Sequence, residues 1–171
     1  MKITIGIPAY NEEKNIAAII TKLKKITNSI IVCDDGSSDM TSKISQDLGV
    51  RVVTHKKNMG YGAAIKSIFL EAKQIHPDIL VTFDADGQHN VEDIKKVIEP
   101  IQKKTSDIVI GSRFLDGKNK EIPRYRKVGI KTITGLTNTL TGTKISDAQS
   151  GFRAYSKKTL KKIAPSDEGM G

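Results

Sequence analysis

The sequence predicts an α/β fold in which a mainly parallel sheet carries helices on both faces. Apolar runs typical of strands alternate with amphipathic patterns of roughly 10–15 residues, an order that favours parallel strands joined by helices. The strand-like runs end in polar, acidic or glycine-rich residues, as expected where a sheet of this class binds a ligand. With 171 residues, the chain suits one domain with a substantial core.

The predicted elements follow one another along the chain. We expect strands over residues 2–7, 29–35, 51–55, 78–86 and 107–112. We expect helices over residues 12–26, 40–48, 60–75 and 91–103. Asn11 is the expected cap of the first helix, whose apolar residues recur at helical spacing. Because no internal repeat or linker divides the sequence, residues 1–171 are interpreted as a single domain.

Basic residues outnumber acidic ones, with 28 Lys and Arg against 19 Asp and Glu and a formal net charge of +9. Such a balance favours an anionic partner, such as a nucleotide, a phospholipid surface or a nucleic acid. Aromatic residues make up only 5% of the chain. Platforms for stacking bases are therefore scarce, and we expect no nucleic-acid partner.

The single cysteine, Cys33, lies in the apolar run "IIVC" and is expected to be a buried structural thiol. One cysteine allows no internal disulfide and fits a reducing compartment, so we expect a cytoplasmic protein. No apolar run approaches the roughly 20 residues that span a bilayer. We therefore expect neither a signal peptide nor a transmembrane helix within these residues.

Two carboxylates follow the fourth strand-like run, in the stretch "VTFDADGQHN". If Asp84 and Asp86 lie on an extended strand, both project to the same side, and their like charges repel unless a cation lies between them. Mg²⁺ and Mn²⁺ bind such oxygen ligands, commonly together with phosphate oxygens. The alternative is a solvated turn at Gly87, because Asp and Gly are common turn residues.

The glycine-rich stretch "NMGYGAA" follows the third strand-like run. It has neither the glycine spacing of a dinucleotide-binding loop nor the lysine of a P-loop. A backbone nest for a pyrophosphate, at the start of the next helix, is the functional hypothesis that remains for it.

Six segments occur in the order and spacing of a known family: "IPAYNEEKNI", "VCDDGSSDMT", "NMGYGAAI", "DADGQHNVEDI", "GSRF" and "SDAQSGFRAY". Together they resemble the inverting family-two glycosyltransferases with the Rossmann-like GT-A fold, in the branch of dolichyl-phosphate mannose synthases and polyprenyl-phosphate glucosyltransferases. The resemblance implies a UDP- or GDP-linked sugar donor, Mg²⁺ or Mn²⁺ as cofactor, and transfer of a hexose to a dolichyl or polyprenyl phosphate. Members of this branch continue past the end of this sequence, which implies a catalytic domain truncated at its C-terminus.

The same resemblance assigns roles to individual residues. It implies that Asp86 and Gln88 hold the metal, with Asp84 at its nucleotide side. Arg113 and Asp147 join Asp86 as implied catalytic residues. The residues implied to bind the substrates are Pro8, Tyr10, Glu12, Asp34, Asp35, Asp84, Ala85, Gln88, Arg113 and Arg153.

Several assignments leave alternatives open. Glu12 suits a base or ribose contact, but it would also favour a helix N-terminus. Transfer to a saccharide or protein hydroxyl needs a general base, for which Asp147 is the candidate. A lipid phosphate is already an anion, so Asp147 would then position the acceptor or hold Arg153. Binding of a sugar nucleotide without turnover is a third function. Because hard metal ions prefer oxygen, His89 is expected to be a neutral surface imidazole and not a further ligand.

Residues 118–131 carry six basic residues and one acidic residue, Glu121. They lead into a helical pattern with Ile133, Leu136 and Leu140 on one side. A basic start before an apolar stripe favours an anionic membrane surface or a lipid phosphate, which would place the protein at the cytoplasmic face of a membrane. The alternative is a solvated loop before an ordinary core-facing helix.

Overall fold

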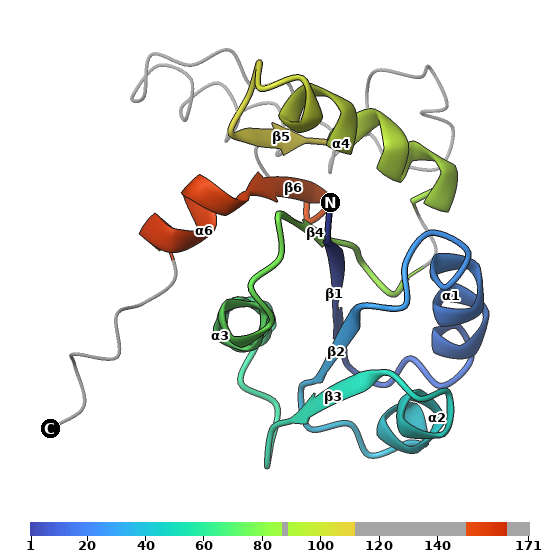
Figure 1. Cartoon of the computed structure of the whole chain (residues 1–171). Coiled ribbons are helices and arrows are strands. Elements are labelled where there is room, and N and C mark those ends of the chain that lie inside the picture. The colour runs from blue at the N-terminus through green and yellow to red at the C-terminus, as the bar shows by residue number, and fades with distance from the viewer. Residues whose placement is uncertain (87–88, 112–149, 164–171) are drawn as a thin grey trace, which may run out of the picture.

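The computed structural model describes residues 1–86, 89–111 and 150–163. In these residues a six-stranded sheet has the strand order β3-β2-β1-β4-β6-β5 (Figure 1). The strands are β1 (Ile3–Ala9), β2 (Ile30–Asp34), β3 (Arg51–Thr54), β4 (Ile79–Thr82), β5 (Ile108–Ile110) and β6 (Arg153–Ser156). The helices are α1 (Ile16–Leu23), α2 (Thr41–Asp47), α3 (Tyr61–Ile75), the 3₁₀ turn η1 (Val91–Asp93), α4 (Ile94–Gln102) and α6 (Lys157–Ile163).

β1 lies in the middle of a parallel block. It pairs with β2, from Ile5 opposite Ile30 to Ala9 opposite Asp34, and with β4 on its other side, while β2 pairs with β3. Because these strands run the same way, the loops after Ala9, Asp34 and Thr82 leave the sheet at one edge. The predicted α/β class with a mainly parallel sheet is confirmed.

Beyond β4, the sheet no longer follows the simple alternation of parallel strands and helices. β6 lies between β4 and β5 and runs antiparallel to both, so that Arg153 pairs with Thr82 on one side and with Ile110 on the other. The sequence analysis expected no strand here. β6 has only four residues, and its partners lie far away along the chain, so no local pattern marks it. The short helix α6 directly after it was missed for the same reason.

Helices cover both faces of the sheet (Figure 1). On one face, the apolar stripes of α1 and α4 pack with Ile5 and Phe83 in the larger core cluster. On the other face, Ile68 of α3 packs with Ile31 and Cys33 of β2 in a second cluster. Side chains of a strand project alternately to its two sides, so one apolar strand supplies both clusters. This double burial explains why the strands read as nearly continuous apolar runs.

Two expectations about the path of the chain are wrong. Asn11 does not cap α1, because it has a left-handed φ of 55° and its Oδ1 accepts a hydrogen bond from the Ser38 N–H at 2.9 Å. The helix begins instead at Ile16. The fourth strand ends at Thr82 and not after the acidic residues, because its partner β6 begins at Arg153, opposite Thr82. The acidic residues therefore lie in a loop and turn.

Cys33 is buried, as expected. Burial raises the pKa of its thiol to about 12, and the nearby Asp35 carboxylate adds to the shift. A protonated thiol is a poor nucleophile, so Cys33 is a structural residue at neutral pH. Within the described ranges, no helix is both long enough and apolar enough to cross a bilayer.

Candidate functional site

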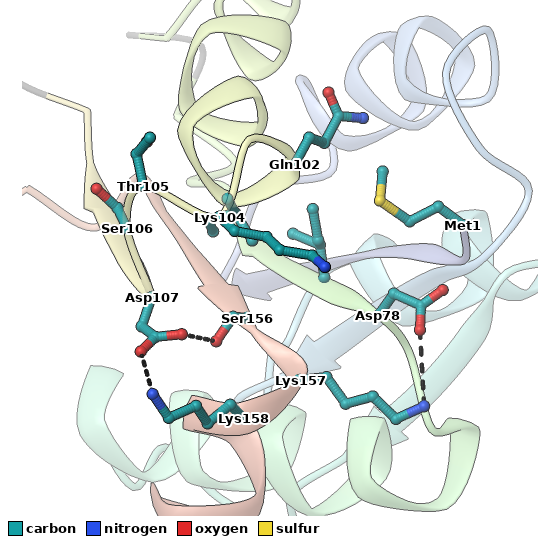
Figure 2. Close-up of a pocket in the computed structure, with 12 residues that line it drawn as sticks. Met1, Asp78, Gln102, Lys104, Thr105, Ser106, Asp107, Ser156, Lys157 and Lys158 are labelled. Carbon is teal, nitrogen blue, oxygen red and sulfur yellow. Dashed lines mark hydrogen bonds and ion pairs between the residues drawn. The ribbon is translucent and has the colours of Figure 1, made fainter.

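A cavity of about 530 Å³ opens at the amino ends of β4 and β5 (Figure 2). Charged side chains around it form ion pairs with one another: Lys157 Nζ lies 3.6 Å from Asp78 Oδ1, and Lys158 Nζ lies 3.0 Å from Asp107 Oδ2. Open α/β sheets bind their ligands outside the carboxyl ends of the strands. This cavity lies at the opposite edge, so we do not assign the active site to it.

A second cavity, of about 230 Å³, lies at the carboxyl ends of β1 and β2 and is called the edge pocket below. Its lining consists of Pro8, Ala9, Tyr10, Asp35, Asn58, Gly60, Tyr61 and Ala64. Pro8, Tyr10 and Asp35 are also substrate-binding residues of the sequence-based prediction, and the fold brings them together here. The Tyr10 and Tyr61 side chains are partly exposed, so their rings are available to pack on a planar ligand.

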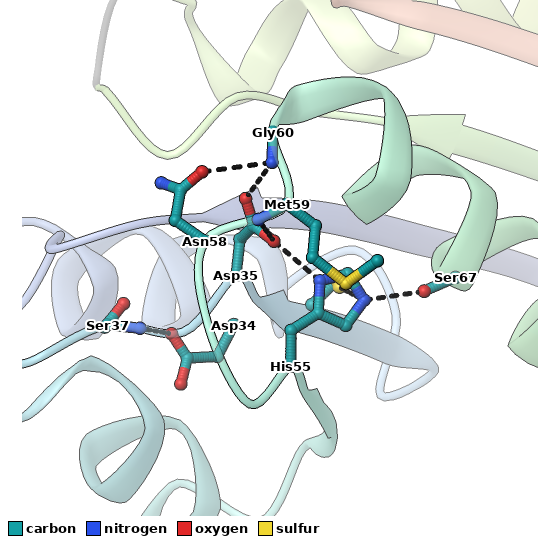
Figure 3. Close-up of polar contacts among 9 residues, drawn as sticks. Asp34, Asp35, Ser37, His55, Asn58, Met59, Gly60 and Ser67 are labelled. Carbon is teal, nitrogen blue, oxygen red and sulfur yellow. Dashed lines mark hydrogen bonds and ion pairs between the residues drawn. The ribbon is translucent and has the colours of Figure 1, made fainter.

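Asp35 is the buried carboxylate of the edge pocket (Figure 3). Its Oδ1 accepts hydrogen bonds from His55 Nδ1 at 2.6 Å and from the Met59 N–H at 3.0 Å, and its Oδ2 accepts one from the Gly60 N–H at 2.8 Å. Burial raises the pKa of a carboxyl group, but these hydrogen bonds outweigh burial and hold the pKa of Asp35 below its usual value. Asp35 is therefore ionised at neutral pH.

His55 is held on its other side as well (Figure 3). Its Nε2 lies 2.8 Å from Ser67 Oγ and 3.6 Å from Cys33 Sγ, and its side chain is 10% exposed. The Ser67 hydroxyl can donate or accept, so it satisfies Nε2 in either form of the ring. The His55 ring is thereby oriented toward Asp35, although it does not itself line the edge pocket.

Asp34 and Glu12 hold the loops at this edge of the sheet. Asp34 is almost fully buried, and its Oδ1 accepts a hydrogen bond from the Ser37 N–H at 3.1 Å. Glu12 Oε2 accepts from Asn15 Nδ2 at 2.9 Å, and the Glu12 N–H donates to Thr41 Oγ1 at 2.8 Å. Neither residue lines the edge pocket. For Glu12, these contacts favour the structural alternative, a role at the start of α1.

Asp84 connects the edge pocket to the acidic loop after β4. Its Oδ1 accepts a hydrogen bond from the Tyr61 hydroxyl at 3.2 Å, and Tyr61 lines the pocket. Burial of the hydroxyl and the neighbouring Asp84 carboxylate both raise the pKa of Tyr61, which is therefore a neutral donor. Ala85 is buried in the core and Asp86 is exposed. Asp84 and Asp86 thus lie on either side of the buried Ala85, at the carboxyl end of β4.

His89 is not a surface side chain, contrary to the sequence-based expectation. Its side chain is 10% exposed, and its ring centroid lies 6.1 Å from that of Phe83 and 5.1 Å from that of Phe152. Its Nε2 lies 3.6 Å from Asp84 Oδ2. Phe152 belongs to a segment far along the chain, so no local pattern could have revealed this burial.

Gly151 approaches the acidic loop so closely that a side chain does not fit. A Cβ atom at this position would lie 2.3 Å from the Tyr61 hydroxyl oxygen and 2.4 Å from Asp84 Oδ1. The Gly151 carbonyl accepts a hydrogen bond from Thr82 Oγ1 at 2.7 Å, and Arg153 pairs with Thr82 in the sheet. The described part of "SDAQSGFRAY" therefore packs on the acidic loop and brings Arg153 to the same edge.

The edge pocket also uses residues that the sequence analysis did not assign, namely Asn58, Gly60, Tyr61 and Ala64, with His55 behind Asp35. The stretch "NMGYGAA" does form a backbone nest, but its Met59 and Gly60 N–H groups bind the Asp35 carboxylate of this chain. These two amides are therefore occupied by an internal anion, and a pyrophosphate at the start of α3 stays a prediction.

Gln88, Arg113 and Asp147 lie outside the described residues. The basic segment 118–131 and the apolar stripe of Ile133, Leu136 and Leu140 lie outside them as well. The roles assigned to these residues stay predictions.

The parallel strands bring the edge pocket and the acidic loop together at the carboxyl ends of β1, β2 and β4, the edge at which open α/β domains bind ligands. The model of Glycosyl transferase family 2 matches residues 4–164, so the chain belongs to this family. It is 39% identical over 177 residues to the UDP-N-acetylglucosamine--dolichyl-phosphate N-acetylglucosaminyltransferase of Methanococcus voltae, covering 92% of this chain and 70% of the relative. It is 36% identical over 174 residues to the dolichol-phosphate mannosyltransferase of Pyrococcus furiosus, covering 95% of this chain and 48% of the relative.

Solved structures share the fold. Glucosyl-3-phosphoglycerate synthase from Mycobacterium tuberculosis, in complex with Mn²⁺, UDP and glucosyl-3-phosphoglycerate, matches with a TM-score of 0.67 at 23% sequence identity. The match covers 92% of this chain and 57% of that chain. It confirms the predicted GT-A fold, and the two named relatives confirm the predicted family and its polyprenyl-phosphate branch.

Proposed function

We propose that this chain carries the catalytic domain of a metal-dependent inverting glycosyltransferase that moves a hexose from a UDP- or GDP-linked sugar to a dolichyl or polyprenyl phosphate. One observation carries the donor half of the proposal: Tyr61 lines the edge pocket and donates a hydrogen bond to Asp84 at 3.2 Å. The pocket and the acidic loop are therefore neighbours. Their order suits a nucleoside in the pocket with its diphosphate at the loop. The names of the Methanococcus and Pyrococcus relatives support the lipid phosphate acceptor.

Asp84 and Asp86 fit a divalent cation, Mg²⁺ or Mn²⁺, because both supply hard oxygen ligands at one end of β4. In the part of the chain that the structure describes, no group of three or more His, Cys, Asp or Glu side chains is placed to bind a metal. One or two carboxylates completed by phosphate oxygens form a common Mg²⁺ site, and Gln88 would add an amide oxygen. When bound, the metal neutralises the charge that develops on the departing diphosphate.

The proposed reaction is a single displacement at the anomeric carbon of the sugar. An oxygen of the lipid phosphate forms a bond to that carbon while the bond to the diphosphate oxygen breaks, and the electron pair of the broken bond leaves with the diphosphate. Attack opposite to the leaving group inverts the configuration. Arg113 and Arg153 are proposed to bind phosphate groups, because a guanidinium offers a planar fork of donors. Tyr10 and Tyr61 are proposed to pack on the base.

A lipid acceptor requires contact with a membrane, so we propose peripheral binding at the cytoplasmic face of an anionic bilayer. The excess of basic residues in segment 118–131 supports this proposal. Each Lys or Arg near an anionic surface contributes about 1 kcal/mol of attraction. Arg124, Arg126 and Lys127 are the proposed centre of the contact. The attraction weakens with salt, because exposed charges are screened beyond roughly 10 Å at 0.1 M.

The Asp147→Asn variant separates a phosphate acceptor from a hydroxyl acceptor. We expect it to keep measurable sugar transfer to a polyprenyl phosphate, because an anionic acceptor has no hydroxyl proton to lose. The measurement is the rate of transfer from a labelled sugar nucleotide, beside a donor titration of the same variant. The Asp47→Asn variant is the control, since Asp47 forms an exposed ion pair with Lys43 on α2. A loss of about 10²- to 10⁴-fold with normal donor binding would favour a hydroxyl acceptor instead.

A further inference from the structure

Asp35 offers a bound base a single hydrogen-bond position, which limits the bases that it accepts. We propose that the donors His55, Met59 and Gly60, which clamp Asp35, make this carboxylate select uracil over guanine, so that the sugar donor is UDP-linked. The inference rests on the proposed function, because it assumes a nucleoside in the edge pocket. It goes beyond that function because it specifies the base of the sugar-nucleotide donor.

Most acceptor positions of the Asp35 carboxylate are already occupied. A carboxylate has two oxygens with about four acceptor positions in total. Oδ1 already accepts two hydrogen bonds, from His55 Nδ1 at 2.6 Å and from the Met59 N–H at 3.0 Å. Oδ2 accepts one, from the Gly60 N–H at 2.8 Å. With these donors in the described part of the chain, one position remains for a ligand, and it is on Oδ2.

The remaining position on Oδ2 belongs to an ionised carboxylate. The hydrogen bonds hold the pKa of Asp35 below its usual value in spite of its burial. An ionised carboxylate accepts hydrogen bonds and donates none. Asp35 therefore binds a base through an N–H group and repels a ring nitrogen that carries a lone pair.

The bases differ in the N–H groups that they present to a carboxylate. Uracil presents one ring N–H, at N3, between two carbonyl oxygens. Guanine presents the N1–H and the N2 amino group side by side, a pair that fits the two oxygens of one carboxylate. Because Oδ1 of Asp35 is saturated, Asp35 can accept only one of these two donors, and the other loses this partner in a buried site, which is unfavourable. Cytosine and adenine present a ring nitrogen lone pair at the corresponding position, which the carboxylate repels.

Asn58 is a further feature of the edge pocket that favours uracil. Asn58 Oδ1 accepts a hydrogen bond from the Gly60 N–H at 3.0 Å, which orients its amide and leaves the NH₂ group to donate (Figure 3). Asn58 lines the pocket, so it can donate to a uracil carbonyl next to N3.

His55 is a positioning residue in this arrangement. It does not line the pocket, but its Nδ1 occupies one acceptor position of Oδ1, and Ser67 Oγ holds its ring from the other side at 2.8 Å. His55 therefore acts on the base through Asp35. Without it, Oδ1 regains an acceptor position, and a second N–H of a bound base can be satisfied.

The test is a calorimetric titration of the whole 171-residue chain with UDP, N3-methyl-UDP, CDP and GDP, each in the presence of Mn²⁺. We expect UDP to bind about 10- to 100-fold more tightly than the other three, the range expected when a buried donor or acceptor loses its partner. GDP or N3-methyl-UDP binding as tightly as UDP would overturn the inference while leaving the proposed function intact. Absence of binding by all four would overturn the proposed function and this inference with it.

Two variants of His55 test the clamp itself. In His55→Ala, the UDP-to-GDP affinity ratio is expected to fall toward one. In His55→Asn, the amide nitrogen takes roughly the place of Nδ1, so the ratio is expected to stay close to that of the unmodified chain. If His55→Ala fails to fold in a thermal melt, Ser67→Ala replaces it and is expected to lower the ratio to a smaller extent. An unchanged ratio in the folded Ala variant of either residue would show that His55 does not set base selectivity.

Discussion

Replacing Asp86 by Ala is expected to abolish Mn²⁺-dependent binding of a nucleoside diphosphate while leaving the fold intact. Asp86 is exposed at the carboxyl end of β4, so its loss creates no cavity and little change in the free energy of unfolding. Even residues that only orient metal ligands contribute 10- to 100-fold to metal affinity. We therefore expect the loss of a direct ligand to weaken binding by at least about 100-fold. Titration calorimetry with UDP and Mn²⁺ measures this loss of affinity.

The control for this variant removes an equivalent charge elsewhere. Asp47→Ala deletes an exposed carboxylate on α2 that pairs with Lys43, and it is expected to bind the nucleotide normally. Binding of uridine without metal should be the same in both variants, because the edge pocket is untouched. Unchanged Mn²⁺-dependent affinity in the Asp86 variant would remove Asp86 from the metal site.

The Gly36→Ala variant is expected to lose both stability and nucleotide binding. Gly36 has a φ of +74°, and a Cβ atom there would lie 2.4 Å from the backbone carbon of Lys57 and 2.7 Å from the Asn58 nitrogen. The left-handed conformation and the backbone clash together destabilise the fold by about 2 to 5 kcal/mol. The clash also pushes the loop that delivers the Met59 and Gly60 N–H groups away from the pocket. Urea unfolding and a UDP titration measure the two losses.

Gly49→Ala is the matched control for Gly36. Gly49 also has a left-handed φ, of +65°, but a Cβ atom there meets nothing within 4 Å. The strain is similar and the clash is absent, so we expect a loss of about 1 to 2 kcal/mol with normal UDP binding. If the two variants unfold at the same urea concentration, the contact between Gly36 and the loop of Lys57 and Asn58 is not what holds the pocket together.

Local periodicity is enough to predict the parallel half of the fold. The strands β1, β2 and β4 and helix α3 appear in the sequence as apolar runs and helical stripes, because each is buried on a regular face. β6 could not be predicted in this way, since four residues carry too little pattern and their partners are remote. Asn11 was wrongly predicted to cap α1, because its side-chain oxygen instead accepts a hydrogen bond from the Ser38 N–H in another loop.

The candidate site likewise contains residues that the sequence could predict and contacts that it could not. Pro8, Tyr10 and Asp35 were assigned through the family resemblance, and the fold brings them together at the carboxyl ends of β1 and β2. The contacts of the Met59 and Gly60 amides with Asp35 could not be predicted, because Asp35 lies more than twenty residues away along the chain. His89 was misplaced because Phe152, which covers it, comes from a distant segment. Side-chain chemistry at strand ends can thus be predicted, whereas the contacts that saturate or bury it depend on tertiary structure.

The position of the metal-nucleotide site is the central claim, and paramagnetic broadening by Mn²⁺ in the NMR spectrum of the labelled chain tests it most directly. With UDP present, Mn²⁺ is expected to broaden the amide signals of Tyr61, Asp84 and Gly151, which lie around the acidic loop. The signals of Thr105 and Ser156, which line the cavity at the opposite edge, should stay sharp. Broadening of Thr105 and Ser156 with sharp signals at Asp84 and Gly151 would contradict the assignment of the site.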